Sequence, residues 1–488
     1  MKQKLHYTLV VLFTFLSSNI ILSQEIVKKG IHELQAKEFG NAANRQINAA
    51  KNISAIIPLQ SKNQKALSKK VFGFLPYWEQ SDGAHNNIQY NLLTHVACFD
   101  FRVQLDASIS TPPGWPWTTE INAAHTAGTK VIMTVVNFGG TDGADAVAWE
   151  LFTNSTKQNT FFANVKNLIE TYSLDGVNID FEGMTSAHRG AELNAFMAKL
   201  TAYIHEELPG KEVSFDGPAV NWGGWIMNDL VDSVDYLIVM AYDYTSASSA
   251  NAGPVAPLKH HTSWKRFITR TIETGTYKEP SANYPEKLVL AVPYYGQHWK
   301  TATSTSESST TSSVGSTRYR NTSVDAAAYG GWKWNEDFEV SWYSWNDGVD
   351  WNQIWADNET SIAKKYDLAI ANNLGGVGIW ALNYDGTRPE LWELINTKFG
   401  ATAGVESNMK EQISFYPNPV NNIINISNLE NIEFAKISIY NVLGKLIKDV
   451  DVRSKAIDIS NLSSGIYLFK VTDISGKAET FKIIKSLF

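Results

Sequence analysis

The sequence predicts an α/β protein with a large (β/α)8 barrel, an insertion after the seventh strand of the barrel, and a small all-β domain at the C-terminus. Three observations support this prediction. Short runs of β-branched and apolar residues alternate eight times with helical patterns in the middle of the 488-residue chain. All 16 tryptophans lie between Trp78 and Trp392, which marks a large central domain. After residue 413 the chain changes to short runs in which apolar and polar residues alternate, as in half-buried strands.

The eight apolar runs are interpreted as the parallel strands of the barrel. Strands that alternate with helices form βαβ units, and eight such units can close into a TIM barrel. The periodicity alone also permits an open, doubly wound sheet. Two intervening segments, 161–172 and 193–208, carry apolar residues at three- and four-residue spacing, which is typical of amphipathic helices. The expected strands are residues 71–75, 92–101, 130–136, 174–181, 212–215, 236–242, 288–293 and 376–382.

Residues 1–24 have the layout of a secretory signal peptide. Lys2 and Lys4 precede the apolar run 7–16, and small residues follow up to Ser23. An uncleaved membrane anchor is the alternative, but the apolar run is short for a span of about 20 residues. We therefore expect an exported protein that is secreted or attached to the cell surface.

Two segments lack the alternation of strands and helices. Residues 25–68 are rich in Lys, Asn, Gln and Ala, and we expect a mobile or partly helical lead-in that links to a barrel domain of residues 69–400. The alternation lapses again after the seventh strand. There we expect a flexible Ser/Thr-rich loop at residues 301–316, followed by a tryptophan-dense insertion at residues 332–355 that overhangs the active face.

Beyond the barrel we expect a linker at residues 401–413 and a sandwich of roughly seven strands at residues 414–488. By composition alone this domain could be a carbohydrate-binding module, but it has no tryptophan. Its motifs Phe-Tyr-Pro-Asn-Pro, Leu-Ser-Ser-Gly-Ile-Tyr and Lys-Ile-Ile-Lys resemble the type A sorting domain of type IX secretion. The resemblance implies a bacterium of the Bacteroidetes kind, with the type IX secretion machinery as a partner.

Composition and charge exclude several partners and cofactors. The net charge of −7 provides no basic surface for nucleic acid. The lone Cys98 excludes an intramolecular disulfide, and the adjacent pair His260 and His261 has no partner at metal-ligand spacing. The sequence contains no phosphate-binding loop and no dinucleotide fingerprint. We therefore predict a monomer without a metal or other cofactor.

The most informative stretch is residues 174–183, Leu-Asp-Gly-Val-Asn-Ile-Asp-Phe-Glu-Gly. Because side chains of a strand point alternately to two faces, Asn178, Asp180 and Glu182 share one face. Two carboxyl groups and an amide are costly to bury unless they are paired, hydrated or used in chemistry. A single Asp-x-Glu more often meets solvent or a lysine, but this one closes a barrel strand, where barrel enzymes place their catalytic groups. We expect Asp175 to order the start of the strand rather than to touch substrate.

This pattern resembles the signature of glycoside hydrolase family 18, the chitinases and related N-acetylglucosaminidases. Four more segments fall in the order and spacing of the family: residues 72–78, 137–140 with Gly139 and Gly140, 240–244 and 376–382. The resemblance covers residues 69–400. It implies a (β/α)8 barrel that cleaves β-N-acetylglucosaminide linkages, as in chitin or chitooligosaccharides.

The resemblance also implies roles for individual residues. Glu182 would be the catalytic acid and then the base, while Asp180 orients the substrate's own 2-acetamido group, which attacks the anomeric carbon so that configuration is retained. Tyr242 and Asp243 would bind the acetamido carbonyl and a sugar hydroxyl, and Trp380 would form the floor under the reacting sugar. The weaker candidates for substrate binding are Tyr77, Trp78, Tyr244 and Tyr295.

Asn178 departs from the commonest family pattern, which has Asp at this position. An amide cannot share a proton with Asp180, so we expect Asp180 to ionise more readily than in a pair of aspartates. Asn also occurs in active branches that resemble the spore-cortex-lytic N-acetylglucosaminidases, so an enzyme directed at peptidoglycan or N-glycans is an alternative. A catalytically inactive sugar-binding relative is another, although such relatives typically lose the glutamate that this chain keeps as Glu182.

Overall fold

The chain divides into two units, residues 1–400 and 401–488. The computed structural model describes residues 30–40, 45–46, 56–60, 67–138, 143–260, 266–400, 414–427, 434–442, 444–450, 456–473 and 478–486. The signal peptide and linker expected from the sequence lie outside these residues, as do Gly139, Gly140 and His261. Within the described ranges, every helix is too short or too polar to cross a membrane.

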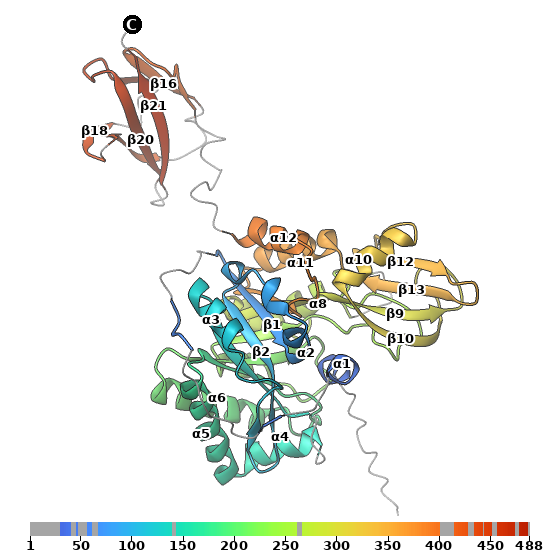
Figure 1. Ribbon diagram of the computed structural model, residues 1–488. Helices are drawn as coiled ribbons and strands as arrows, with labels where there is room; N and C mark the ends of the chain where they lie inside the picture. Colours follow the sequence, from blue (N-terminus) through green and yellow to red (C-terminus); the bar gives the residue numbers. More distant parts are fainter. Residues whose placement is uncertain are drawn as a thin grey trace, which may run out of the picture. The chain divides into compact units, whose positions relative to one another are not determined.

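Eight parallel strands close into a barrel in the first unit (Figure 1). The strands follow the order β1, β2, β4, β5, β6, β7, β8 and β14, and β14 pairs back onto β1. This closure confirms the predicted fold class and excludes the open sheet. Their bounds are β1 (Lys70–Pro76), β2 (His95–Val103), β4 (Lys130–Val136), β5 (Gly176–Asp180), β6 (Glu212–Pro218), β7 (Tyr236–Met240), β8 (Leu288–Pro293) and β14 (Gly376–Trp380). The second strand begins later than expected because residues 90–92 form a 3-10 helix, η3 (Tyr90–Leu92). A short strand, β3 (Ile109–Ser110), pairs antiparallel with β2.

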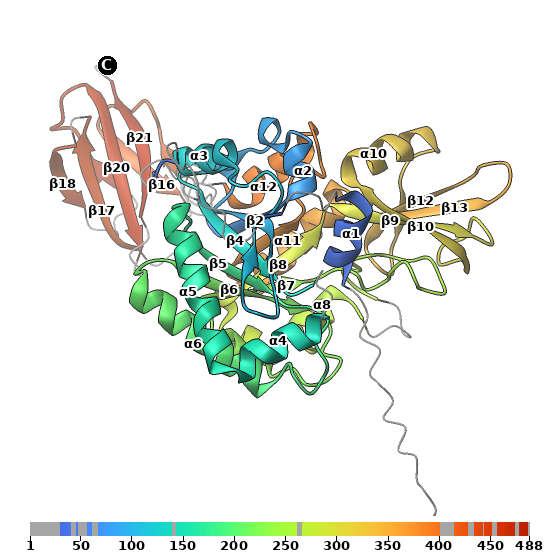
Figure 2. The same ribbon diagram turned by 60° about the horizontal axis from the view of Figure 1, so that its bottom comes forward.

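Helices cover the outside of the barrel (Figure 2). The two predicted amphipathic helices are α5 (Ser155–Thr171) and α6 (Ala191–Glu207). The side chain of Asn154 accepts hydrogen bonds from the first turn of α5, which separates this helix from α4. The other helices of the barrel are α2 (Tyr77–Ser81), η2 (Ala84–Asn86), α3 (Thr118–Ala127), α4 (Ala144–Thr153), α7 (Met227–Asp232), α8 (Ile268–Glu273), α9 (Lys278–Asn283), η4 (Pro285–Lys287), α11 (Glu359–Ala371) and α12 (Glu390–Phe399).

The insertion after the seventh barrel strand forms its own antiparallel sheet, in the order β10, β9, β13, β12, β11. Trp299, Trp342 and Trp355 pack with Phe338 in a small core of this insertion. The prediction of a flexible Ser/Thr-rich loop is wrong for residues 310–316, which belong to β10 and pair with β9. Backbone hydrogen bonds hold this strand although its side chains are exposed or only half-buried. The bounds are β9 (Tyr295–Thr301), β10 (Thr310–Arg318), α10 (Tyr319–Ala328), β11 (Lys333–Asn335), β12 (Val340–Asn346) and β13 (Trp351–Ala356).

The second unit consists of two antiparallel sheets, one ordered β15, β16, β19 and the other β18, β17, β20, β21. The sheets share one apolar core that includes Ile424, Ile439 and Phe469. Seven strands are present in the described part of this unit, as the sequence predicted. Their bounds are β15 (Ser414–Tyr416), β16 (Ile423–Ser427), β17 (Phe434–Asn441), β18 (Leu446–Val450), β19 (Ala456–Asp458), β20 (Gly465–Asp473) and β21 (Ala478–Lys485).

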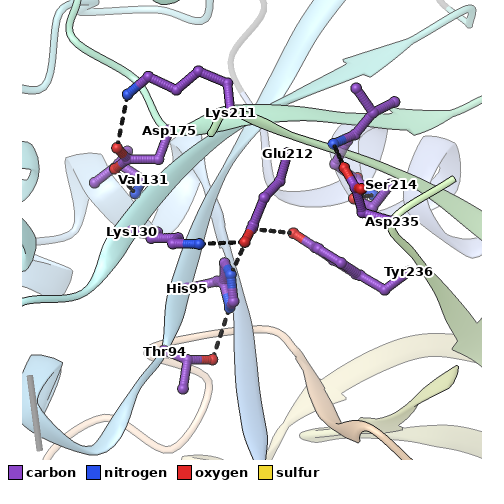
Figure 3. A network of polar contacts seen from close by, with 12 residues as sticks. Thr94, His95, Lys130, Val131, Asp175, Lys211, Glu212, Ser214, Asp235 and Tyr236 are labelled. Atoms are coloured by element: carbon purple, nitrogen blue, oxygen red, sulfur yellow. Dashed lines mark hydrogen bonds and ion pairs between the residues drawn. The ribbon is translucent and has the colours of Figure 1, made fainter. Parts of the chain in front are cut away.

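A polar network closes the amino-terminal end of the barrel (Figure 3). The carboxylate of Glu212 accepts hydrogen bonds from His95 Nε2 at 2.9 Å, from the Tyr236 hydroxyl at 3.3 Å and from the Lys130 ammonium group. Burial alone would raise the pKa of Glu212, but the bond from His95 and the charge of Lys130 lower it to about 2. Burial lowers the pKa of His95, against the raising effect of its bond to Glu212.

Asp175 belongs to the same end of the barrel. One of its oxygens accepts a hydrogen bond from the backbone N–H of Val131 and another from His125 Nε2, both at 2.9 Å. Its other oxygen lies 3.0 Å from Lys211 Nζ. Asp175 therefore orders the start of β5, as expected, at the end of that strand opposite to Asp180.

Replacing Glu212 with glutamine is expected to lower the free energy of unfolding by about 1–3 kcal/mol at pH 7. The lowered pKa of Glu212 means that its contribution is present above the ordinary value of 4.5 and is lost as the pH falls toward 2. The difference between the parent chain and Glu212→Gln should therefore shrink between pH 5 and pH 3 in urea unfolding experiments. Glu207→Gln, at an exposed pair with Lys166, is the matched control. An equal loss of stability at pH 7 and pH 3 would contradict this account.

Candidate active site

The carboxyl-terminal ends of four barrel strands bring polar side chains together. Asn178 and Asp180 on β5 are fully buried, and Glu182 follows the strand with 14% of its side chain exposed. Three other strands add the remaining members of this group: Asp216 on β6, Tyr242 after β7 and Trp380 at the end of β14. Barrel enzymes place their chemistry at this end of the strands.

Asn178 is directed toward the neighbouring strand. Its Nδ2 donates hydrogen bonds to Asp216 Oδ1 at 2.8 Å and to Ser214 Oγ at 3.0 Å. Burial raises the pKa of Asp216 well above its ordinary value, and the negative charge of Asp180 adds to this effect. A second buried carboxyl group therefore does stand near Asp180, although position 178 carries an amide. Asp216 is not among the predicted site residues because the fifth strand was expected to end at residue 215, whereas it continues to Pro218; the alternation of Ser214 and Asp216 was the available signal.

Asp180 is held in an environment that disfavours its charge. Burial raises the pKa of Asp180 to about 6, against the lowering effect of the nearby His32 cation, and the charge of Glu182 raises it further. Within the described residues, Asp180 Oδ1 accepts no hydrogen bond, and neither does Asp216 Oδ2 or Asn178 Oδ1. Buried polar atoms of this kind are rare in folded proteins and mark a site built to meet a polar ligand.

Glu182 is positioned through its backbone by Asn137. The side-chain amide of Asn137 accepts a hydrogen bond from the N–H of Glu182 and donates one to its carbonyl oxygen, both at 2.9 Å. A third bond, to the carbonyl oxygen of Ala144 at 3.0 Å, fixes the amide itself. These hydrogen bonds involve only the backbone of Glu182, so its carboxyl group remains available for contacts in the site. Asn137 directly precedes the predicted Gly-Gly segment, whose glycines lie outside the described residues.

Helix α1 (Ile31–Phe39), from the lead-in, enters this site. His32 Nδ1 lies 2.8 Å from Asp180 Oδ2 and 2.9 Å from Glu182 Oε1, and His32 Nε2 lies 2.9 Å from the Tyr242 hydroxyl. The imidazole lies over Trp380, with ring centroids 3.8 Å apart and planes tilted by 32°. Burial alone would lower the pKa of His32, but the two carboxylates raise it to about 10, so the ring is an imidazolium. His32 is not among the predicted site residues because the lead-in shows only weak periodicity and no site motif.

The predicted aromatic residues after β7 and β8 divide into two groups. Tyr295 lies near Tyr242, with ring centroids 6.2 Å apart in an edge-on arrangement, and Asp243 adopts a left-handed backbone conformation with φ of 57° beside them. Tyr244 instead points its hydroxyl toward Thr271 Oγ1 of α8, at 2.7 Å. The structure thus brings Tyr295 to the group around Tyr242 and directs the hydroxyl of Tyr244 away from it.

Tyr77 and Trp78 begin α2, directly after the first strand. Trp78 packs edge-on against Trp380, with centroids 6.3 Å apart, and its Nε1 donates to the Tyr384 hydroxyl at 3.2 Å. Tyr77 packs edge-on against Trp78 and lies against α1, where its hydroxyl donates to the carbonyl oxygen of Ala36 at 3.4 Å. Both residues therefore belong to the wall of the site.

Comparison with known proteins assigns the barrel. A family model described as glycosyl hydrolases family 18 matches residues 70–385, which is more than half of the chain. The chain belongs to this family. The family 18 barrel confirms the predicted family and the predicted enzyme class, a glycoside hydrolase.

This family 18 hydrolase is similar in sequence to several animal proteins. It is 26% identical over 277 residues to the di-N-acetylchitobiase of Homo sapiens, with 49% of this chain and 68% of that protein covered. It is 23% identical over 282 residues to a probable endochitinase of Caenorhabditis elegans, with 52% of this chain and 44% of that protein covered.

Solved structures share the fold. A chitinase from Cycas revoluta in complex with (GlcNAc)3 has a TM-score of 0.59 at 19% identity, with 67% of this chain and 99% of that chain covered. The Bacillus cereus spore cortex-lytic enzyme has a TM-score of 0.58 at 17% identity, with 69% and 75% covered. The family 18 hydrolase therefore shares its barrel architecture with a chitinase and with a spore cortex-lytic enzyme.

The C-terminal unit of the family 18 hydrolase has a separate assignment. Residues 414–486 match a family model described as a secretion system C-terminal sorting domain. This match confirms the predicted type IX sorting domain and places the hydrolase outside the cell or on its surface.

The family 18 site also contains a set of metal-type donors that the sequence did not predict. His32 Nδ1 and one oxygen each of Asp180 and Glu182 lie within 4.8 Å of one another, so a metal ion could use them. The separations of 2.8 and 2.9 Å from Nδ1 to the two oxygens are those of charge-assisted hydrogen bonds. In this arrangement a proton on the imidazole links the three groups.

Proposed function

We propose that this family 18 hydrolase cleaves β-N-acetylglucosaminide linkages in chitin or chitooligosaccharides by a retaining, substrate-assisted mechanism. The observation that carries the proposal is the pair Asp180 and Glu182 at the end of β5, which faces the Tyr242 hydroxyl and the ring of Trp380 around one small volume filled by His32. The names of similar proteins, chitinases among them, agree with this substrate class.

In the first half of the proposed reaction, Glu182 donates its proton to the glycosidic oxygen, and the bond from that oxygen to the anomeric carbon breaks. The oxygen of the substrate's 2-acetamido group forms the new bond to the anomeric carbon, which gives a five-membered oxazolinium ring. Asp180 accepts a hydrogen bond from the acetamido N–H and stabilises the positive charge that develops there. Its Oδ1, which has no partner among the described residues, is available for this bond.

In the second half, the Glu182 carboxylate takes a proton from water while the water oxygen attacks the anomeric carbon and opens the ring. Two displacements at one carbon retain its configuration. The Tyr242 hydroxyl donates to the acetamido carbonyl, Asp243 binds a sugar hydroxyl, and the apolar face of the sugar packs on Trp380. Among the weaker binding candidates, Tyr295 is best supported because it lies beside Tyr242, and Tyr244 is least supported.

A peptidoglycan-directed β-N-acetylglucosaminidase is the second candidate. The amide at Asn178 and the structural likeness to the spore cortex-lytic enzyme favour it. A catalytically inactive sugar-binding protein is not favoured, because both Asp180 and Glu182 are retained and lie together.

We also propose an organisation of the whole chain. Residues 1–24 are a signal peptide, 25–68 the lead-in, 69–400 the catalytic barrel, 401–413 a linker and 414–488 the sorting domain. The spacing of the motifs along the sequence supports these bounds. The protein acts as a monomer.

Incubation of the purified chain with N-acetylchitooligosaccharides and with peptidoglycan tests the proposal. Mass spectrometry identifies the products, and NMR of the first product formed reports the anomer. We expect the β-anomer from chitooligosaccharides and product formation about 10²–10⁴-fold slower with Glu182→Gln. Cleavage of peptidoglycan alone would favour the second candidate, initial release of the α-anomer would contradict the retaining mechanism, and binding without cleavage by both proteins would indicate a sugar-binding protein.

A further inference from the structure

We propose that residues 30–40 are an autoinhibitory segment, in which α1 occupies the sugar cleft of the hydrolase and must leave before substrate can bind. The inference rests on the proposed function, because the cleft that α1 closes is the proposed sugar site. Figure 2 shows α1 in dark blue between the barrel and the insertion. It precedes the first barrel strand in the chain, yet it reaches the ends of β5 and β14.

The buried face of α1 is directed into the cleft. Ile31, His32, Gln35 and Ala36 are buried, while Lys37 on the opposite side is exposed. The helix begins after Gly30, with Glu33 in its first turn and Lys37 in its last, so both charges agree with the helix dipole. The segment is thus built as a helix with one face for the site and one for solvent.

Two side chains of α1 contact polar groups of the proposed sugar site and of its wall. His32 contacts Asp180, Glu182 and Tyr242. Gln35 Oε1 accepts hydrogen bonds from Trp380 Nε1 at 2.8 Å and from the Tyr384 hydroxyl at 2.9 Å. Removal of these groups from water is costly unless partners replace the water, and α1 supplies the partners.

The imidazolium of His32 resembles the intermediate of the proposed reaction. Both are flat, five-membered, positively charged rings that carry an N–H group. His32 directs its Nδ1–H toward Asp180 and Glu182 and lies on Trp380, which are the groups proposed to surround the oxazolinium. A site that stabilises the charge of the intermediate should also bind this cation, because the same electrostatic complementarity serves both.

Glycine permits the closest approach of the segment. A Cβ at Gly30 would coincide with the carboxylate of Glu182, and one at Gly40 would overlap the Tyr77 hydroxyl. The backbone at Gly30 is extended, with φ of −69°, so alanine there meets no conformational strain, but its Cβ and the Glu182 carboxylate compete for the same space. Gly30→Ala therefore sets the docked segment against the Glu182 side chain, whereas the double variant His32→Ala/Gln35→Ala weakens docking without adding any atom.

Further contacts are made by Phe39 of the segment and by Arg45, which follows it in the chain. The guanidinium of Arg45 forms an ion pair with Asp100 of β2 and lies 5.0 Å from the ring centre of Tyr77. Arg318 of β10 lies 4.0 Å from the ring centre of Phe39. The barrel does not need these contacts to close, because β1 pairs directly with β2 and β14.

The test compares the full chain with Gly30→Ala and with the double variant His32→Ala/Gln35→Ala. Lys37→Ala is the matched control on the exposed face of the same helix. Initial rates with N-acetylchitooligosaccharides and calorimetric binding of N-acetylchitotriose are measured for each, after thermal unfolding shows that the barrel is intact. We expect kcat/KM and the association constant to rise ten-fold or more in both docking variants and to stay unchanged in Lys37→Ala.

The outcomes separate this inference from the proposed function. Tighter binding by the docking variants without hydrolysis by any chain would support autoinhibition and overturn the hydrolase. Hydrolysis and binding that are equal in all chains would overturn autoinhibition and leave the hydrolase standing. If all chains bind the sugar equally, or none binds it, and no chain hydrolyses it, both autoinhibition and the hydrolase are overturned. An NMR titration of the His32 ring adds a readout without sugar: a docked ring stays protonated at pH 8, and a ring that loses its proton below pH 7 contradicts docking.

Discussion

Replacement of Glu182 by glutamine is expected to lower kcat about 10²–10⁴-fold, which is the usual effect of losing a general acid and base. Glutamine has nearly the same shape and keeps hydrogen-bonding capacity, but it cannot give a proton to the glycosidic oxygen. The backbone grip of Asn137 does not involve the carboxyl group, so the position of residue 182 should persist. In a chain whose cleft is already open, sugar binding should therefore change little.

The Glu182 experiment is best made in the Gly30→Ala background as well as in the parent chain, because the carboxylate of Glu182 also binds His32. In the parent chain, Glu182→Gln removes one partner of the docked helix and could open the cleft while it stops the chemistry. Steady-state rates and calorimetric binding of N-acetylchitotriose distinguish these effects. Glu207→Gln is the control, at a carboxylate that is 40% exposed. Retention of more than a tenth of the parent kcat by Glu182→Gln would refute the role of Glu182 as the acid.

Asp180→Asn is expected to lower kcat about 10²–10³-fold, since it removes the charge proposed to stabilise the developing cation. The ionised form of Asp180 is the active one, so activity should be lost as the pH falls through its pKa, which is about 6 in the docked state. The charge of His32 lowers that pKa, whereas Glu182 and Asp100 raise it. When α1 leaves, the lowering effect of His32 is lost and water relieves the burial that raises the pKa of Asp180, so the acid side of the profile reports the balance of the two effects.

The pH profile of kcat/KM checks the assignment of Asp180. The acid limb of Gly30→Ala should disappear in Gly30→Ala/Asp180→Asn. An acid limb that is unchanged by Asp180→Asn would assign the titration to another group. Asp216 is the first alternative, because it is equally buried and its pKa is also raised.

The barrel and the central carboxylates could be predicted because they follow local rules. Alternating side chains along one strand place Asp180 and Glu182 on the same face, and the order of strands and helices allows few ways to close a sheet. The Ser/Thr segment from Thr310 onward was not recognised as a strand, because both its apolar content and its burial are low. Its pairing with β9 depends on backbone hydrogen bonds, which leave no pattern in the residue types.

His32 and Gln35 could not be predicted for a different reason. Their contacts are with residues that lie 148 to 349 positions away in the sequence, and neither residue lies in a segment with a motif. A histidine in a polar lead-in looks like a solvated side chain until the fold brings Asp180 to it. Asp216 is an intermediate case, because its alternation with Ser214 was visible and only the end of the strand was misplaced.

Because α1 and the cleft belong to one chain, the proposed inhibitor is supplied at an effective concentration that does not depend on how dilute the enzyme is. For short tethers this local concentration is on the order of millimolar. The helix can therefore block the site with modest intrinsic affinity, and sugars at micromolar concentration compete poorly with it. One broken peptide bond between Gly40 and Lys70 would turn the helix into a free peptide that is lost by dilution. The covalent connection would then make activation by proteolysis irreversible, whereas displacement by a concentrated polymer would be reversible.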